Sequence, residues 1–261
     1  MTRVLISALL LVMISACSST PDRQSQSPSL IPDSRPEADL NEAAKLNTEL
    51  GVAYARNGDF DVALEKLLRA LEQNKNYAPA HQAIAFVYQQ RRDTENAERH
   101  FKRALQLSPG DPNTRNNFGV FLCGQNRHAE AEKLFMQAAA TPSYTEPEKA
   151  HTNAGVCARS IQDLGKAEVH FREALRLKPD SAEALRQLAS LLYERRDYPR
   201  AKAFLQRYEK MGPPTAATLW LGAKLESALG DQRAAAVYAR RLKTDFPDSE
   251  ESVSLSSRPA S

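Results

Sequence analysis

The chain has 261 residues, of which 42% are hydrophobic, 26% are charged and 7% are aromatic. Its 35 Lys and Arg against 32 Asp and Glu leave a net charge of +3, too nearly balanced for a protein that binds nucleic acid through its charge. The low aromatic content argues against an all-β chain, and no apolar run reaches the roughly 18 residues that would span a bilayer.

The first residues have the pattern of a bacterial lipoprotein signal. Arg3 supplies a positive charge, Val4 to Ile14 form a short apolar stretch, and two small residues precede Cys17. An apolar stretch this short is typical of a cleaved signal, here predicted over residues 1–16. The stretch resembles a lipobox, which implies that Cys17 is acylated, although an ordinary signal with an incidental cysteine is the alternative. In such lipoproteins Ser18 after the cysteine implies the outer membrane of a Gram-negative cell, facing the periplasm.

A polar segment follows the predicted lipidation site. Residues 18–36 include six Ser and four Pro and almost nothing apolar. Such a composition cannot bury enough surface to offset the entropy of ordering the chain. We therefore predict that residues 17–40 are the lipidated cysteine and a flexible tether.

Residues 41–249 repeat one unit six times. An aligned small residue recurs at separations of 34, 34, 36, 34 and 34, namely at Ala63, Ala97, Ala131, Ala167, Ala201 and Ala235. A large apolar residue follows four positions later in most units, and a proline follows 12 positions later in four of six. Positions i, i+4 and i+7 share one helical face, and proline ends a helix. Each unit is therefore predicted to be a pair of antiparallel helices.

A helical hairpin of 34 residues resembles the tetratricopeptide repeat. We predict an all-α superhelical solenoid of six such repeats over residues 44–77, 78–111, 112–145, 148–181, 182–215 and 216–249. The sixth is predicted to be a degenerate cap, because Glu226 and Ala239 stand where larger apolar residues usually lie. Residues 250–261 are predicted to be a polar tail.

The sequence offers no catalytic or metal-binding constellation. It contains no His-Glu-x-x-His, no Cys-x-x-Cys, no Gly-rich phosphate loop and no Gly-x-Ser-x-Gly. The histidines follow the repeat, which favours packing or surface roles over metal ligation. We predict a protein that is not an enzyme, that needs no cofactor or metal, and that binds neither nucleic acid nor a small-molecule substrate.

Cys123 and Cys157 lie 34 residues apart on the first helices of adjacent repeats. With Cys17 lipidated, they make an even number of cysteines in a compartment that permits disulfides. A disulfide is the favoured interpretation, and two buried free thiols are the alternative.

First helices line the concave surface of a helical-hairpin solenoid, where partners bind. The predicted groove is rich in amides, with apolar spots and little charge, which suits a peptide or a helix. For any one amide, hydrogen bonding to its neighbours in the fold is an equally good interpretation. The candidates are Gln82, Phe86, Gln89, Gln90, Asn113, Asn116, Asn117, Val120, Thr152, Asn153, Val156, Arg159 and Ser160.

Three segments carry a closer resemblance: RNNFGVFLCGQNRHAEAEKLF (115–135), LLYERRDYPRAKAFL (191–205) and LWLGAKLESALGDQRAAAVYARRLKTDFPDSEE (219–251). With the lipobox and the repeats, they are similar to the type IV pilus biogenesis lipoproteins of the PilW/PilF family. The resemblance implies a pilotin, an outer-membrane lipoprotein that helps the pilus secretin to localise and assemble, and disulfides like Cys123–Cys157 occur in some members. The alternative is a lipoprotein adaptor that docks periplasmic peptidoglycan hydrolases or proteases.

Overall fold

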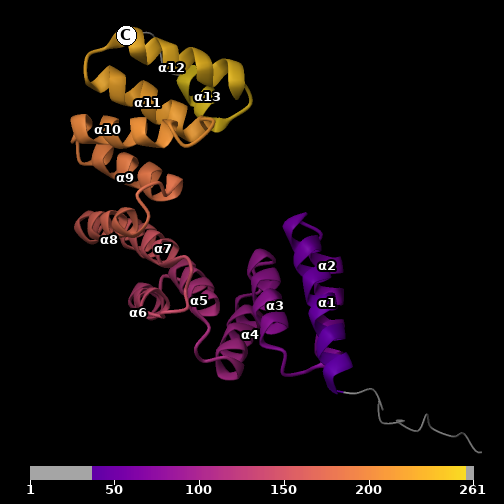
Figure 1. Cartoon of the computed structure of the whole chain (residues 1–261). Helices are drawn as coiled ribbons and strands as arrows, with labels where there is room; N and C mark the ends of the chain where they lie inside the picture. Colours follow the sequence, from indigo (N-terminus) through magenta and orange to yellow (C-terminus); the bar gives the residue numbers. More distant parts are fainter. Residues whose placement is uncertain (1–36, 257–261) are drawn as a thin grey trace, which may run out of the picture. The chain divides into compact units, whose positions relative to one another are not determined.

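The computed structural model describes residues 37–256, which form thirteen α-helices and no strand (Figure 1). The helices are α1 (Glu37–Arg56), α2 (Phe60–Gln73), α3 (Ala78–Gln90), α4 (Thr94–Leu107), α5 (Pro112–Gly124), α6 (His128–Ala139), α7 (Pro147–Ser160), α8 (Leu164–Leu177), α9 (Ala182–Glu194), α10 (Tyr198–Glu209), α11 (Ala216–Ala228), α12 (Gln232–Asp245) and α13 (Glu250–Ser256). The first twelve pair in chain order as six hairpins, which confirms the predicted all-α repeat fold.

The repeating alanines explain why the hairpins form. All six aligned alanines are buried, and so are the large residues that follow five of them four positions later. In α2, for example, Ala63, Leu67 and Ala70 share one buried face at the helical spacing. The prolines predicted to end second helices lie just beyond them, as Pro109 does after α4. The apolar spacing therefore creates both the helices and the faces that they bury.

The turn inside each hairpin has one backbone conformation. A residue with a positive φ precedes the N-cap of the second helix in all six hairpins, namely Gly58, Arg92, Asn126, Gln162, Arg196 and Gly230. Four of the N-cap residues are aspartates whose carboxylate accepts a backbone N–H of the first helical turn, as Asp163 does from Lys166. The turns thus keep the same period as the buried alanines.

Glycines set the closest approach of two helices in several hairpins. A Cβ placed on Gly119 would lie 2.7 Å from Phe135 Cε1, and one on Gly155 would lie 2.5 Å from Phe171 Cε1. Because those distances are shorter than any van der Waals contact, only glycine lets the aromatic ring lie directly on the first helix.

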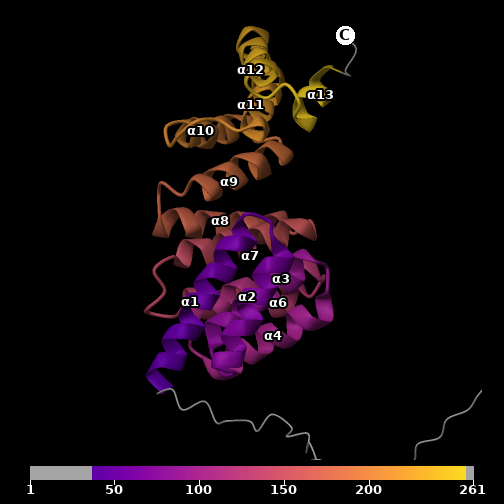
Figure 2. The same ribbon diagram turned by 90° about the vertical axis from the view of Figure 1, so that its right-hand side faces the viewer.

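Successive hairpins contact each other in a similar way, except that α3 and α5 lack the close contact found between the other neighbouring first helices. First helices contact first helices, α1 with α3, α5 with α7, α7 with α9 and α9 with α11, whereas each second helix contacts the first helix that follows it. Figure 2 shows α8, α9 and α10 lying one above another. The first helices therefore form a layer of their own, which is the layer that lines the partner-binding side in solenoids of this type.

Two predicted boundaries are wrong. α1 begins at Glu37, so residues 37–40 belong to a helix rather than to the tether. This stretch follows Pro36 and starts with acidic residues, both of which favour a helix N-terminus.

Residues 250–256 form α13 instead of part of a polar tail. The backbone N–H of Ser252 donates to Ser249 Oγ at 3.2 Å, and Glu250 and Glu251 occupy the first turn. α13 contacts α11 and α12 and so covers the last hairpin.

The sixth repeat is less degenerate than its sequence suggests. Ala239 is only half-buried, but the ring of the preceding residue, Tyr238, lies against Gly222 in the place of the usual large side chain. Glu226 is buried, and one carboxylate oxygen lies 2.8 Å from Lys202 Nζ. An ion pair therefore stands in for an apolar contact at this position.

Within residues 37–256, no helix is both long enough and apolar enough to cross a membrane.

Candidate partner-binding face

Three apolar side chains stand exposed at equivalent positions of successive first helices. Phe86 of α3 is 44% exposed, Val120 of α5 is 39% exposed, and Val156 of α7 is 38% exposed. Each lies one residue after the small residue that packs inside its own hairpin, so the repeat itself directs all three away from the core. We call these three residues the inner row.

The equivalent residue of α1, Val52, is apolar but half-buried, and the row does not continue beyond α7. The equivalent position of α9 holds Ser190, and the 34-residue period places Lys224 at this position of α11, so the exposed apolar character ends there. Lys224 Nζ lies over the rings of Tyr193 and Trp220, 4.8 and 5.4 Å from their centroids. The surface of the first helices therefore changes from apolar to polar and cationic after α7.

Uncharged polar groups flank the inner row. A cavity of about 460 Å³ lies between the N-terminal parts of α3 and α5. Three predicted groove residues, Gln82, Asn113 and Asn117, line it. Asp111 is its single acidic group, and that carboxylate already accepts the backbone N–H of Thr114 at 2.7 Å. The cavity thus offers amide donors and acceptors with little net charge.

Two predicted groove residues are not available to a partner. Asn116 is 8% exposed and Thr152 is 4% exposed. The amide oxygen of Asn116 accepts from Asn153 Nδ2 at 2.9 Å, and the hydroxyl of Thr152 donates to the Glu148 carbonyl at 2.7 Å. For these two residues the structure favours internal hydrogen bonding, because their positions turn toward the neighbouring helix.

The remaining candidates lie at the surface. Gln90 and Ser160 are exposed, and Gln89 and Asn153 are half-buried. The Arg159 guanidinium forms an ion pair with Glu194 of α9 and donates to Gln187 Oε1 at 2.9 Å. Arg159 therefore links α7 to α9, and its charge is paired rather than available to a partner.

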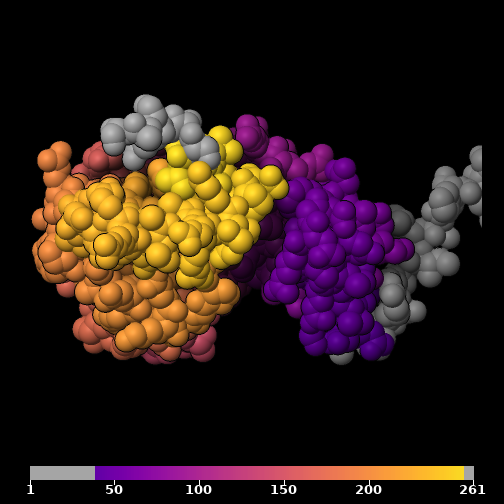
Figure 3. All heavy atoms as spheres, turned by 90° about the horizontal axis from the view of Figure 1, so that it is seen from above, coloured from indigo at the N-terminus to yellow at the C-terminus, as the bar shows by residue number. Residues whose placement is uncertain are grey.

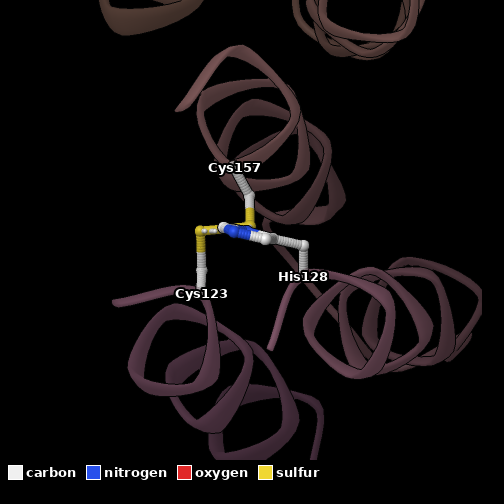
Figure 4. Close-up of side chains that lie close together, drawn as sticks. All are labelled: Cys123, His128 and Cys157. Carbon is white, nitrogen blue, oxygen red and sulfur yellow. Dashed lines mark hydrogen bonds between the residues drawn. A yellow bond between two sulfur atoms is a disulfide. The ribbon is translucent and has the colours of Figure 1, made fainter. Parts of the chain in front are cut away.

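Cys123 and Cys157 lie together at the C-terminal ends of α5 and α7 (Figure 4). Their Cα atoms are 5.8 Å apart and their sulfurs are joined in a disulfide, which links repeats three and four. The ring of His128, the first residue of α6, lies beside the bond, with Nδ1 3.4 Å from Cys157 Sγ and 3.9 Å from Cys123 Sγ. In the part of the chain described, these three side chains are the one cluster with three metal-ligand atoms close together.

The other four histidines form two equivalent pairs. The Nδ1 atoms of His81 and His100 are 3.0 Å apart, and those of His151 and His170 are 3.4 Å apart. Burial lowers the pKa of all four, most strongly that of His100, to about 4. The pairs hold the two helices of repeats two and four together.

The structure also shows an apolar surface that the sequence analysis missed. Leu46, Leu50 and Tyr54 of α1 are 52%, 50% and 36% exposed. The matching positions of α9 are fully buried against the preceding hairpin, whereas no hairpin precedes α1 among residues 37–256. The first hairpin, indigo in Figure 3, therefore presents a broad surface of its own. Its position at the start of the repeat array is the signal that could have revealed it.

The predicted lipidation site, Cys17, lies outside the described residues, as does the rest of the segment before Glu37.

Comparison with known proteins identifies both the fold and the family. Models of the tetratricopeptide repeat match residues 38–79, 48–112, 88–142 and 162–225. The type IV pilus assembly protein PilF of Pseudomonas aeruginosa is 29% identical over 211 residues, which are 81% of this chain and 84% of that protein.

Solved structures agree. The crystal structure of PilW, described as a widely conserved type IV pilus biogenesis factor, has a TM-score of 0.75 at 30% identity and covers 83% of this chain and 100% of its own. That of Pseudomonas aeruginosa PilF has a TM-score of 0.72 at 28% identity, covering 84% and 98%. Together with the six hairpins, these matches confirm the predicted resemblance, and the chain belongs to the PilF/PilW family of type IV pilus biogenesis proteins built from tetratricopeptide repeats.

Proposed function

We propose that this protein is a pilotin-like lipoprotein of the outer membrane whose inner row holds a segment of the pilus secretin while secretin subunits assemble. Membership of a type IV pilus biogenesis family supports a role in building the pilus. The single observation that supports the mode of binding is the row of exposed apolar side chains on α3, α5 and α7. Tetratricopeptide repeats supply the scaffold, and no residue is assigned a catalytic role.

The chemistry of the face fits a peptide segment. Phe86, Val120 and Val156 are spaced one repeat apart, so together they can take up the apolar side of one extended strand or helix. Amides of Gln82, Asn113 and Asn117 lie beside them and can bond to peptide N–H and C=O groups. Because this side carries little unpaired charge, we expect affinity for the partner to depend weakly on salt.

Lipidation at Cys17 is the second part of the proposal. Each buried CH₂ of an acyl chain contributes about 0.8 kcal/mol, so two or more chains give stable anchoring. Because the lipid and the tether would keep the repeats close to the membrane, the repeats would meet secretin subunits there at a raised effective concentration. The sequence before Glu37 supports this step through its lipobox resemblance and its Ser/Pro composition.

Site-specific photocrosslinking tests the binding mode. A photoreactive residue replaces Val120 or, as a matched control, Val169, a valine of the second helix α8 that is 66% exposed. We expect the secretin to be crosslinked from position 120 and not from position 169. Equal crosslinking from both, or capture of peptidoglycan hydrolases or proteases in place of the secretin, contradicts the proposal.

Removal of the acylation site tests the anchor. We expect Cys17→Ala to leave the protein in the soluble fraction and to lower the amount of assembled secretin and of surface pili. Secretin multimers are measured on gels and the lipoprotein by fractionation. Unchanged multimers with the variant soluble would show that anchoring is not needed.

A further inference from the structure

We propose that Cys123, His128 and Cys157 form a binding site for Zn²⁺ or a similar thiophilic metal ion when the disulfide between the two cysteines is reduced. The proposal rests on a juxtaposition of three side chains from three helices, α5, α6 and α7 (Figure 4). It is independent of the partner that the inner row binds.

The distances already suit metal coordination. The two sulfurs and the imidazole nitrogen all lie within 4.8 Å of one another. Thiolates bind Zn²⁺ at about 2.3 Å and imidazoles at about 2.0 Å, so tetrahedral ligand atoms are about 3.5 Å apart. His128 Nδ1 lies 3.4 Å from one sulfur and 3.9 Å from the other. Only the two sulfurs must move apart, and breaking their bond permits that.

The surroundings also favour this cluster. Cys157 is buried and the other two residues are half-buried, so the site is sheltered from water yet reachable. Two thiolates and one imidazole are the donors that Zn²⁺ prefers, and three protein ligands leave a fourth position open for water or for a group from a partner.

The histidine pairs are weaker candidates. Glu132 Oε1 lies 3.7 Å from His170 Nε2, but it is the other nitrogen of that ring, Nδ1, that faces His151, so neither pair gathers three ligand atoms at one place among the described residues. The cavity beside His81 and His100 is lined by Arg99, Lys102 and Arg103, whose charges repel a metal cation. The Cys-His-Cys cluster is therefore the site that we test.

The chemistry has two balanced steps. A dithiol reductant transfers two electrons and two protons to the disulfide, which becomes two thiols while the reductant becomes a disulfide. Zn²⁺ then displaces one proton from each thiol, and neutral His128 donates the lone pair of Nδ1. The disulfide and the metal complex exclude each other, but either one links α5 to α7. A chain whose thiols have not yet been oxidised would thus hold repeats three and four together through the metal.

Cobalt binding tests the site. The full soluble chain from residue 18 is reduced anaerobically with dithiothreitol, freed of it, and titrated with Co²⁺. We expect one equivalent to give thiolate-to-cobalt charge-transfer absorption that Zn²⁺ abolishes, and the oxidised protein to give none. Absence of this absorption in the reduced wild type overturns the proposal.

Variants at position 128 test the third ligand. We expect His128→Ala to bind Co²⁺ at least about tenfold more weakly, and His128→Cys, which restores a third donor, to bind tightly. His100→Ala serves as the control and should bind like the wild type. Helix content is checked by circular dichroism for each variant. If folded His128→Ala binds Co²⁺ as tightly as the wild type, the imidazole is not a ligand.

Discussion

Close contact between a glycine and an aromatic ring recurs in the middle of this protein. On α5, a Cβ on Gly119 would lie 2.7 Å from the ring of Phe135, whereas one on Gly124 would meet nothing within 4 Å. The two glycines thus differ in packing although they belong to the same helix and lie only five residues apart.

This difference gives a matched pair of substitutions. We expect Gly119→Ala to lower the free energy of unfolding by about 1–3 kcal/mol, because the ring or the helix must move. Gly124→Ala should be neutral or slightly stabilising, since alanine favours a helix over glycine. Urea unfolding followed by circular dichroism measures both. Equal effects of the two substitutions would contradict the packing argument.

At the residue scale, the sequence predicted which residues are buried in the core better than which residues are accessible to a partner. Burial of the aligned alanines followed from the period alone, because a residue that recurs every 34 positions meets the same neighbours in every repeat. The groove residues were harder. Asn116 and Thr152 were assigned to the surface by their position in the repeat, but a small rotation of a helix turns a residue at the edge of a face into the interior. Their neighbours Asn113 and Val156 remained outside.

Between elements, one buried ion pair joins the last two hairpins. Glu226 of α11 is 5% exposed and pairs with Lys202 of α10, whose side chain is 36% exposed. Removing one partner leaves the other charge without compensation inside the protein.

Lys202→Met should therefore destabilise the protein by about 1–3 kcal/mol, a range reduced because solvent reaches the lysine. Adding Glu226→Gln in the same chain should recover part of the loss. The exposed pair Glu173–Arg176 is the control, and Arg176→Met should change stability by less than about 0.5 kcal/mol. Additive effects of the two Lys202 and Glu226 substitutions would show that the pair is not coupled.

The histidine pairs make the stability of repeats two and four depend on pH. Burial, with His81 and Arg99 nearby, lowers the pKa of His100 from its ordinary value of 6.5 to about 4. Between these values the unfolded chain binds a proton that the folded chain does not. The stabilisation is therefore complete above pH 6.5 and is lost as the pH falls toward 4.

We expect the melting temperature to fall between pH 7 and pH 5, and to fall less in His100→Gln. The other three paired histidines have pKa values shifted in the same direction, so the variant should flatten the profile only in part. Carboxyl groups titrate mostly below this window. A His100→Gln profile with the wild-type slope would rule out this origin of the pH dependence.

Elements at the two ends were the least predictable. α13 is only seven residues long and mostly polar, so it carries no apolar period, and its existence depends on the hairpin that it covers. The start of α1 was misplaced because the repeat alignment begins at residue 44, whereas the helix extends to Glu37. Where a helix lacks a neighbour on one side, the repeat pattern no longer fixes where it begins or ends.

For the whole molecule, the period determined the fold, and the family followed from similarity over most of the chain. The site could be predicted only in part. The exposure of Phe86, Val120 and Val156 followed from their repeat position, whereas their role in binding stays a prediction, and the period alone could not show that the row stops at Ser190. The sequence also could not predict that His128 lies beside the two cysteines, because its position depends on the turn between α5 and α6.

The central claim is that the inner row binds the secretin. The most direct measurement is calorimetric titration of the purified periplasmic part of the secretin into the soluble chain and its variants. We predict that Phe86→Ser with Val120→Ser weakens binding at least about tenfold, equivalent to about 1.4 kcal/mol, with the helix content unchanged. Leu50→Ser on the exposed face of α1 should bind as the wild type does. Unchanged affinity in the double variant, or loss only in Leu50→Ser, would contradict the claim.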